Sequence, residues 1–194
     1  MSSEPLARLL DSILIAIAGP LIHINIYMKK FTSLRTIRII ISFYAVVLIV
    51  SGLTAIPLRL ELSVMNSFLG EGTFIDSSFP SFSAWISLIN SAIEYISEEY
   101  PFLAYGYDWM AFGHFVIAIA FIGAVVDPVN RIWVVEFGII ACILVIPYGF
   151  IMGYFRGIPI FWSFIDSLFG IFGVIPLLVA RTMILRIDNN SKSG

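Results

Sequence analysis

The chain has 194 residues, of which 59% are hydrophobic and 12% are charged, with a formal net charge of −2. A soluble domain carries about a quarter charged residues, so this composition excludes an ordinary water-soluble globular protein. No basic tract indicates a nucleic-acid partner. The single cysteine, Cys142, lies in an apolar run, so an intrachain disulfide is excluded.

Residues 1–36 allow three interpretations. The stretch 12–28 is apolar, but Gly19, Pro20, His23 and Asn25 interrupt it. It is an interfacial helix, a fifth span, or an extension upstream of a natural start at Met28, where two lysines precede the first span. We expect a cytoplasmic or interfacial segment or an extension, because a fifth span would place the amino terminus outside.

Four apolar stretches predict membrane-spanning helices. They cover residues 37–58, 108–126, 132–155 and 159–180. Each is near the roughly 20 residues that cross a hydrocarbon core of about 30 Å, and helices satisfy the backbone there without water. We therefore predict an all-α integral membrane protein, a four-transmembrane-helix bundle embedded in the lipid bilayer.

Residues 59–107 form the only sizeable segment between spans. Glycines, serines and a proline in its first half predict irregular structure. Its second half has helical spacing, with one apolar face formed by Trp85, Leu88, Ile89, Ala92 and Ile96. We predict an extracytoplasmic amphipathic helix on the membrane surface. An aromatic belt follows, formed by Tyr100, Phe102, Tyr105, Tyr107 and Trp109.

The charges predict the orientation of the spans. Nine of the eleven basic residues fall on one side of a four-span topology, including Arg38, Arg131 and the tail 181–194. Segment 59–108 instead carries seven acidic residues against Arg59 alone. The positive-inside rule makes the basic side cytoplasmic, so both termini are expected inside a bacterial cytoplasmic (inner) membrane.

Small residues predict close packing of the last two spans. Ser163, Ser167, Gly170 and Gly173 follow one stripe of the fourth span, and Gly149 and Gly153 are four residues apart in the third. Such residues let helices approach closely in lipid. Asp166 lies beside the stripe of the fourth span, so its side chain is expected to face the bundle interior.

Four polar residues are predicted to form a layer in the outer half of the bundle. At about 1.5 Å per residue, His114 and Asp166 both lie roughly 10 Å below the outer ends of their helices, and Asp108 and Arg156 lie near those ends. Ionisable groups within spans are costly and mark candidate sites. The functional interpretation is a small ligand pocket or a proton-handling site; the structural one is a hydrogen bond that fixes helix register.

A second polar group is predicted at the inner ends of the spans. Asp127 followed by Pro128 is a favourable helix start. Arg131 and Glu136 follow, and Arg181 closes the fourth span. We expect structural ion pairs here, with Glu136 neutralised by Arg131 or Arg181.

Several kinds of chemistry find no support in the sequence. His23 and His114 fall at different depths, which disfavours a bis-histidine haem. No metal-ligand spacing and no phosphate-binding loop occurs. We therefore expect neither a cofactor nor a metal, and the apolar middle of the spans argues against a channel.

The residues from Tyr107-Asp108-Trp109 through Asp127-Pro128 to Trp162 resemble a group of small bacterial inner-membrane proteins. The resemblance covers roughly the last 90 residues; it implies a four-helix membrane protein and no particular activity. Arg38 and Ser51-Gly52-Leu53 are similar to the DoxX-type four-helix family. The long acidic loop departs from the compact DoxX pattern, so no redox role is carried over.

Two hypotheses for the function follow. The first is a non-enzymatic accessory or assembly component with a membrane-protein partner or a second copy of itself. The alternative is a carrier or membrane enzyme that binds a small or lipidic, quinone-like ligand in the outer polar layer. A cavity beside His114 and Asp166 would favour the second, and direct bonds between them the first.

Overall fold

The computed structural model of the protein describes residues 33–192, and the statements below concern this part of the chain. The interpretations of residues 12–28 lie outside it. Its elements are α3 (Leu34–Ala55), α4 (Leu58–Leu69), α5 (Pro80–Glu99), the short 3-10 helix η2 (Pro101–Ala104), α6 (Tyr105–Val126), α7 (Ile132–Arg156) and α8 (Ile160–Lys192).

Four of these helices, α3, α6, α7 and α8, are long and apolar enough to cross a membrane. The prediction of an all-helical chain with four such helices is confirmed. The helix bounds differ from the expected spans most at the end of the chain, where α8 continues past residue 180 to Lys192. No glycine or proline follows Pro176 in this helix, and Met183 and Ile184 are buried in the core, so nothing ends the helix earlier.

Local sequence signals set the ends of the spans. The Ser33 side chain accepts a hydrogen bond from the Thr36 amide at 3.2 Å, which caps the start of α3. α3 ends at Ala55, just before Pro57, which has no amide hydrogen to donate to the preceding turn. α7 ends at Gly157, whose φ of 66° is left-handed. The Ile158 amide then donates to the Gly153 carbonyl at 2.9 Å, which gives a glycine-terminated helix end.

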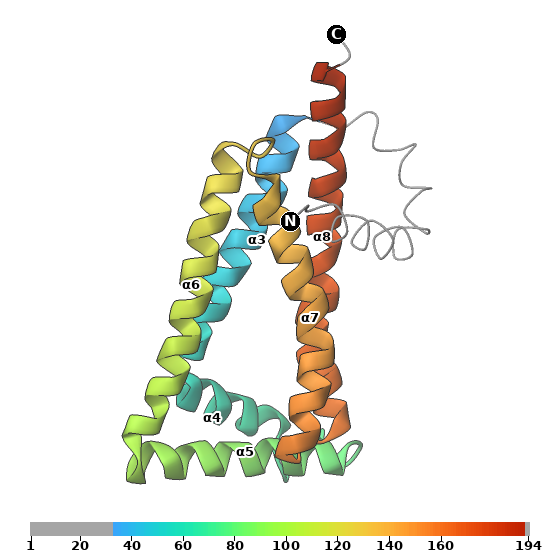
Figure 1. The fold of residues 1–194 in the computed structure, drawn as a ribbon. Helices are drawn as coiled ribbons and strands as arrows, with labels where there is room; N and C mark the ends of the chain where they lie inside the picture. Colours follow the sequence, from blue (N-terminus) through green and yellow to red (C-terminus); the bar gives the residue numbers. More distant parts are fainter. Residues whose placement is uncertain (1–32, 193–194) are drawn as a thin grey trace.

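The four spans are arranged as two pairs (Figure 1). α3 packs along α6, and α7 packs along α8, whereas contacts between α6 and α7 are few. The two pairs meet at the end that holds the α6–α7 link, which we call the core end, and they separate toward the other end. α5 lies across the separated ends, which we call the α5 end (Figure 1).

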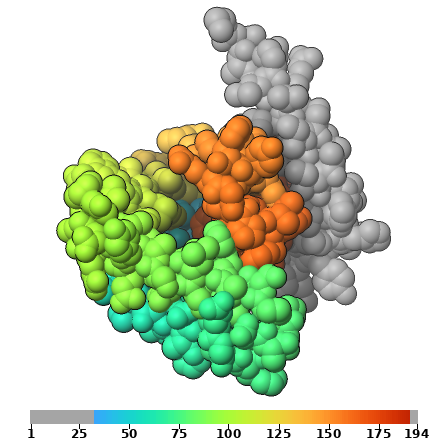
Figure 2. Space-filling model, turned by 90° about the horizontal axis from the view of Figure 1, so that it is seen from below, coloured from blue at the N-terminus to red at the C-terminus, as the bar shows by residue number. Residues whose placement is uncertain are grey.

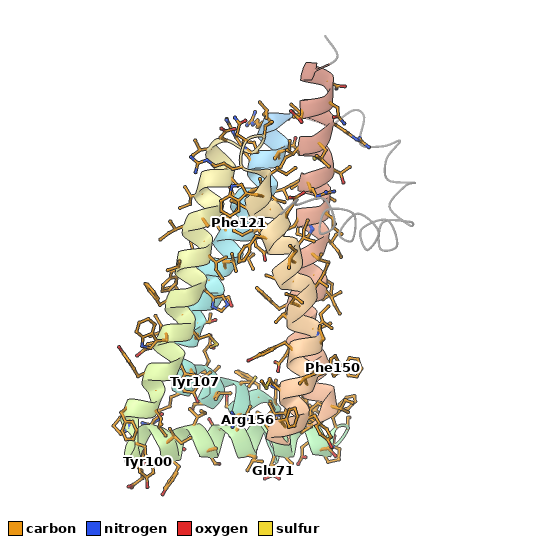
Figure 3. The ribbon with its side chains drawn as sticks, in the orientation of Figure 1. Glu71, Tyr100, Tyr107, Phe121, Phe150 and Arg156 are labelled. Atoms are coloured by element: carbon orange, nitrogen blue, oxygen red, sulfur yellow. The ribbon has the colours of Figure 1, made fainter. Side chains whose placement is uncertain are left out.

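The buried core is concentrated where the pairs meet. It draws apolar side chains from all four spans: Ile37, Ile41, Tyr44, Ala45, Leu48, Ala118, Phe121, Ala124, Val134, Val135, Ile139, Cys142, Leu177, Leu178, Ala180, Met183 and Ile184. Phe121 lies between the two pairs in Figure 3 and is fully buried. The packing that joins the pairs therefore occupies only part of the length of the spans.

Tyr44 of α3 contacts the other three spans at this level. Its ring lies 4.8 Å from that of Phe121 on α6, measured between centroids. Its hydroxyl lies within hydrogen-bonding distance of Cys142 Sγ on α7, at 3.3 Å. On α8, a side chain at Gly173 would meet both Cys142 and the Tyr44 ring at 3.0 and 3.4 Å. Tyr44 and Cys142 thus link the two helix pairs, and glycine at position 173 leaves room for them.

Two helices, rather than one, connect the pairs at the α5 end. Irregular structure was expected over the first half of segment 59–107, but Leu58–Leu69 forms helix α4. Its less exposed apolar residues are Leu58, Leu62, Met65 and Leu69, a spacing that is typical of a helix. Arg59 on α4 bonds to Glu98 and Glu94 on α5, with N–O distances of 2.7 and 3.3 Å.

The two faces of α5 pack differently from those of a helix that only lies on a membrane surface. The polar face packs on α4, with the Ser87 hydroxyl donating to Asn66 Oδ1 at 2.8 Å. Ile86 is fully buried on this side. On the apolar face that the sequence predicted, Leu88 and Ala92 are exposed and the other residues are partly covered. Near the start of α5, Trp85 and Phe82 contact Trp162 of α8.

The close approach within the α7–α8 pair predicts the effect of enlarging Gly170. A Cβ there would lie 2.5 Å from the Cys142 carbonyl oxygen and 2.6 Å from Val145. We expect Gly170→Ala to lower the free energy of unfolding by about 1–3 kcal/mol, measured by titration with sodium dodecyl sulfate in mixed micelles. Gly113→Ala is the control, because a Cβ at that position meets nothing within 4 Å. Equal effects of the two substitutions would contradict this packing.

Candidate functional site

His114 lies on the face of α6 that points toward the other spans. Ala118 and Phe121, one and two turns along the same face, are 1% and 0% exposed. A side chain at Gly52 on α3 would come within 3.1 Å of the His114 Cβ. His114 itself is half-buried, whereas Ala111, on the side of α6 that packs on α3, is 1% exposed. The side of α6 that bears the His114 ring is therefore less covered at this level.

The bonding of His114 fixes which ring nitrogen is available. Its Nδ1 lies 2.8 Å from the Met110 carbonyl oxygen, one turn earlier in α6. A carbonyl only accepts, so Nδ1 carries the proton and, in the neutral ring, Nε2 is an acceptor. The ring meets Phe169 of α8 edge-on, with centroids 6.5 Å apart. This contact bridges the two helix pairs.

Asp166 lies on the inward face of α8. Leu177 and Ile184 lie on the same face and are both fully buried. Ile184 is five full helical turns beyond Asp166. Asp166 is nevertheless exposed. Because the same face is buried at the core end and open here, the helices leave space in front of the Asp166 carboxylate.

The helices that carry these residues, α6 and α8, border an opening at the α5 end that we call the hollow. Seen from that end, the surface is hollowed between α6 and the turn that joins α7 to α8 (Figure 2). The contact of His114 with Phe169 joins α6 to α8, and Asp166 and Trp162 follow on α8 toward α5. Within residues 33–192 no hydrogen bond or ion pair joins His114 to Asp166, and the Asp166 carboxylate has no bonded partner. The outer polar residues do not form a bonded network.

Arg156 and Asp108 lie apart from this pair. Arg156 is the last residue of α7, exposed and near the α5 end (Figure 3). Asp108 is on the other side of α6, where it lines a shallow depression of about 230 Å³ with Tyr105, Trp109 and Phe112. Of the four predicted residues, the structure places His114 and Asp166 at the hollow, Arg156 at the end of α7, and Asp108 away from it.

An aromatic cluster lies where α5 meets the start of α8. The ring centroids of Trp85 and Trp162 are 6.4 Å apart, and those of Phe82 and Trp162 are 6.3 Å apart. Ser83, fully buried, and Trp85 have their hydroxyl oxygen and indole nitrogen enclosed without a hydrogen-bond partner in the described part of the chain. A buried donor or acceptor left unpaired costs about 1–3 kcal/mol, which opposes the stability gained from the packing of α5.

The inner polar residues make several separate contacts at the core end. Arg181 Nε donates to Glu136 Oε1 at 2.9 Å, which links α8 to α7. Asp127 accepts from the Asn130 side chain at 2.9 Å within the α6–α7 link. Arg38 Nη2 donates to the Val126 carbonyl at 3.0 Å and so caps α6. These contacts hold the helix ends together.

Two ionisable groups outside the spans have shifted pKa values. Hydrogen bonds from the Asn130 side chain and amide hold the pKa of Asp127 below its usual value. Hydrogen bonds to Glu98 and Glu94 hold the pKa of Arg59 above its usual value. Both shifts favour the charged forms, so the turn at the core end and the α4–α5 contact stay ionised near neutral pH.

Some residues of the hollow were not identified from the sequence. Phe169 and Trp162 looked like ordinary apolar residues of a span, yet they flank Asp166 one turn away on either side. Their spacing from Asp166, three and four residues, was the available signal. The Tyr44–Cys142 contact joins residues 98 positions apart, and no sequence pattern indicates it.

Comparison with protein-family models, curated proteins and solved structures finds no match to this chain. Within residues 33–192 no three His, Cys, Asp or Glu side chains are grouped so that they could hold a metal ion. Evidence for the function therefore comes from the geometry of the hollow.

Because the hollow is open at the α5 end, we expect water to reach some positions of α8 and not others. In protein reconstituted in lipid nanodiscs, a cysteine at Asp166 should react with a permanently charged methanethiosulfonate reagent. A cysteine at Leu177, fully buried on the same side of the helix, should not react. A cysteine at Leu168, exposed on the opposite side, should also fail to react, because a charged reagent does not enter lipid. Labelling that is equal at 166 and 177 would contradict the open outer half.

Proposed function

We propose that this protein spans a bacterial inner membrane and binds a small, lipid-soluble ligand in the hollow between its two helix pairs. The observation that carries the proposal is the position of His114 and Asp166. Both lie on inward faces of helices, at a level where the pairs have separated, and neither bonds to the other. Apolar pockets with a few convergent polar groups are the usual form of small-molecule sites.

We infer that the core end faces the cytoplasm. Arg35, Arg38, Arg131, Arg181 and Arg186 belong to the helix ends and the link on that side. Among residues 33–192, the α5 end carries the acidic residues of segment 59–108 and only Arg59 and Arg156 as bases. The positive-inside rule favours this orientation. The hollow then opens in the outer half of the bilayer, with α4 and α5 extracytoplasmic.

The exposed apolar face of α5 supports a position at the outer membrane surface. Leu88 and Ala92 are uncovered on that face, while the opposite face bonds to α4. A helix with one apolar face lies stably in the interface plane, where lipid covers that face. In this position α5 borders the hollow on its outer side without closing it toward the lipid.

A membrane-soluble ligand has a route into the hollow from the side. α6 and α7 are neighbours joined by a short link, but they contact each other little and diverge from the core end (Figure 1). A molecule dissolved in the outer leaflet can therefore approach Asp166 between these helices. This favours an amphiphile over a water-soluble metabolite.

The alternative, a purely structural accessory protein, has less support. In that role the buried polar residues would hold helices together, as Glu136 and Arg181 do at the core end. Within the described residues, the only hydrogen bond of His114 is to its own helix, and Asp166 has none. Their cost in an apolar span is therefore not offset by a structural bond.

The orientation is tested by labelling in intact cells. Ser77 is exposed between α4 and α5, so a cysteine at this position should react with a membrane-impermeant maleimide added from outside. The wild-type chain is the control, because Cys142 is 3% exposed. Labelling only after the cells are broken open would place α5 in the cytoplasm.

Ligand binding is tested by native mass spectrometry of protein released from mild detergent. The wild-type protein should retain about one small amphiphile per chain. The double variant His114→Leu/Asp166→Leu should lose it, and Asp108→Leu, on the other side of α6, should keep it. Equal helical content of the three proteins controls for folding. A wild-type protein that carries no adduct, or equal retention by the double variant, would refute the proposal.

A further inference from the structure

The charge of the ligand can be inferred from the groups that border the hollow. The Asp166 carboxylate is exposed there and has no bonded partner in the described residues. An ionised carboxylate only accepts hydrogen bonds, and Nε2 of neutral His114 also only accepts. A ligand that bonds to both groups must therefore donate hydrogen bonds, and the ionised Asp166 carboxylate adds a negative charge.

We propose that the hollow takes a lipophilic cation, an amphiphile with an amine or another positively charged group that lies against Asp166. This inference rests on the proposed ligand site and names its substrate class. A carboxylate within a span is costly when isolated. A cation held beside it would offset that cost, because opposite charges attract more strongly beside apolar helices than in bulk water. An anionic ligand would add a second negative charge to the same space.

The aromatic residues around Asp166 fit the same class of ligand. Trp162 lies one turn toward α5, and Phe169 lies one turn toward the core end, where it meets His114. The faces of aromatic rings attract cations within about 6 Å, and tryptophan does so most strongly. A cation at Asp166 would thus have an aromatic residue one turn away on either side, and the His114 ring beyond Phe169.

The surrounding charge would draw cations to this end of the protein. Segment 59–108 carries seven acidic residues and one arginine, so its formal charge is 1 − 7 = −6. Arg59 is already bonded to Glu98 and Glu94. Arg156, at the end of α7, is the other base at this end among residues 33–192. Asp166 lies seven positions after Pro159, about 10 Å further along the axis of α8. A surface potential of one sign raises the local concentration of oppositely charged ligands.

Two ions of nearly equal size and opposite charge test the inference. Tetraphenylphosphonium and tetraphenylborate are titrated into nanodiscs of zwitterionic lipid with and without the protein, and binding beyond that of empty nanodiscs is measured by equilibrium dialysis. Tetraphenylphosphonium should bind saturably to the protein, and tetraphenylborate should not. Asp166→Asn should weaken tetraphenylphosphonium binding about tenfold or more, because it removes the negative charge beside the cation. This ion has no N–H or O–H group, so the loss reports the attraction between charges alone.

Two further variants separate charge from folding. Asp166→Glu keeps the carboxylate and should retain most of the binding. Glu99→Gln, at an exposed position at the end of α5, removes the same charge elsewhere and should change the affinity little.

Equal binding of both ions with no effect of Asp166→Asn would overturn the cation inference and leave a ligand site in place. Absence of binding by either ion, with a native amphiphile still retained, would also overturn it. Loss of both would overturn the ligand site itself.

Discussion

The junction around Tyr44 is the constraint on which the rest of this structure depends. One side chain of α3 contacts Phe121 on α6, Cys142 on α7 and the space left by Gly173 on α8. Large apolar residues pack around it and hold both helix pairs together at one level. Since a helix is stiff over its length, pairs that cross at one level and are not packed elsewhere must diverge. The hollow is the consequence of that divergence.

Small residues and large residues have different roles in the bundle. Gly52 lets α3 approach α6, and Gly170 and Gly153 let α7 approach α8, so each pair stays closely packed along its length. Between the pairs, comparable packing occurs only at the core end. At the other end α4 and α5, joined through Arg59, connect the pairs at a distance (Figure 1). This division of packing leaves Asp166 in an open space inside the outline of the bundle.

The sequence predicts the parts of the fold that depend on local composition. Apolar length predicts the four spans, and helical depth places His114 and Asp166 in the same half of the bundle. It does not predict that His114 meets Phe169 instead of Asp166, because that depends on how far the pairs have separated. Helix α4 was missed because charged Arg59 and Glu61 obscure its short apolar face. Asp108 was grouped with the site by depth alone, although its position around α6 turns it away.

The separation of the pairs at the α5 end is the central claim, and pulsed electron paramagnetic resonance tests it most directly. Spin labels at Phe112 and Met152, both exposed, report the α6–α7 distance near the α5 end. Labels at Val126 and Trp133, also exposed, report it at the core end. In nanodiscs, the first pair of labels should be clearly farther apart than the second. Equal distances at the two ends would mean a parallel, closed bundle without a hollow.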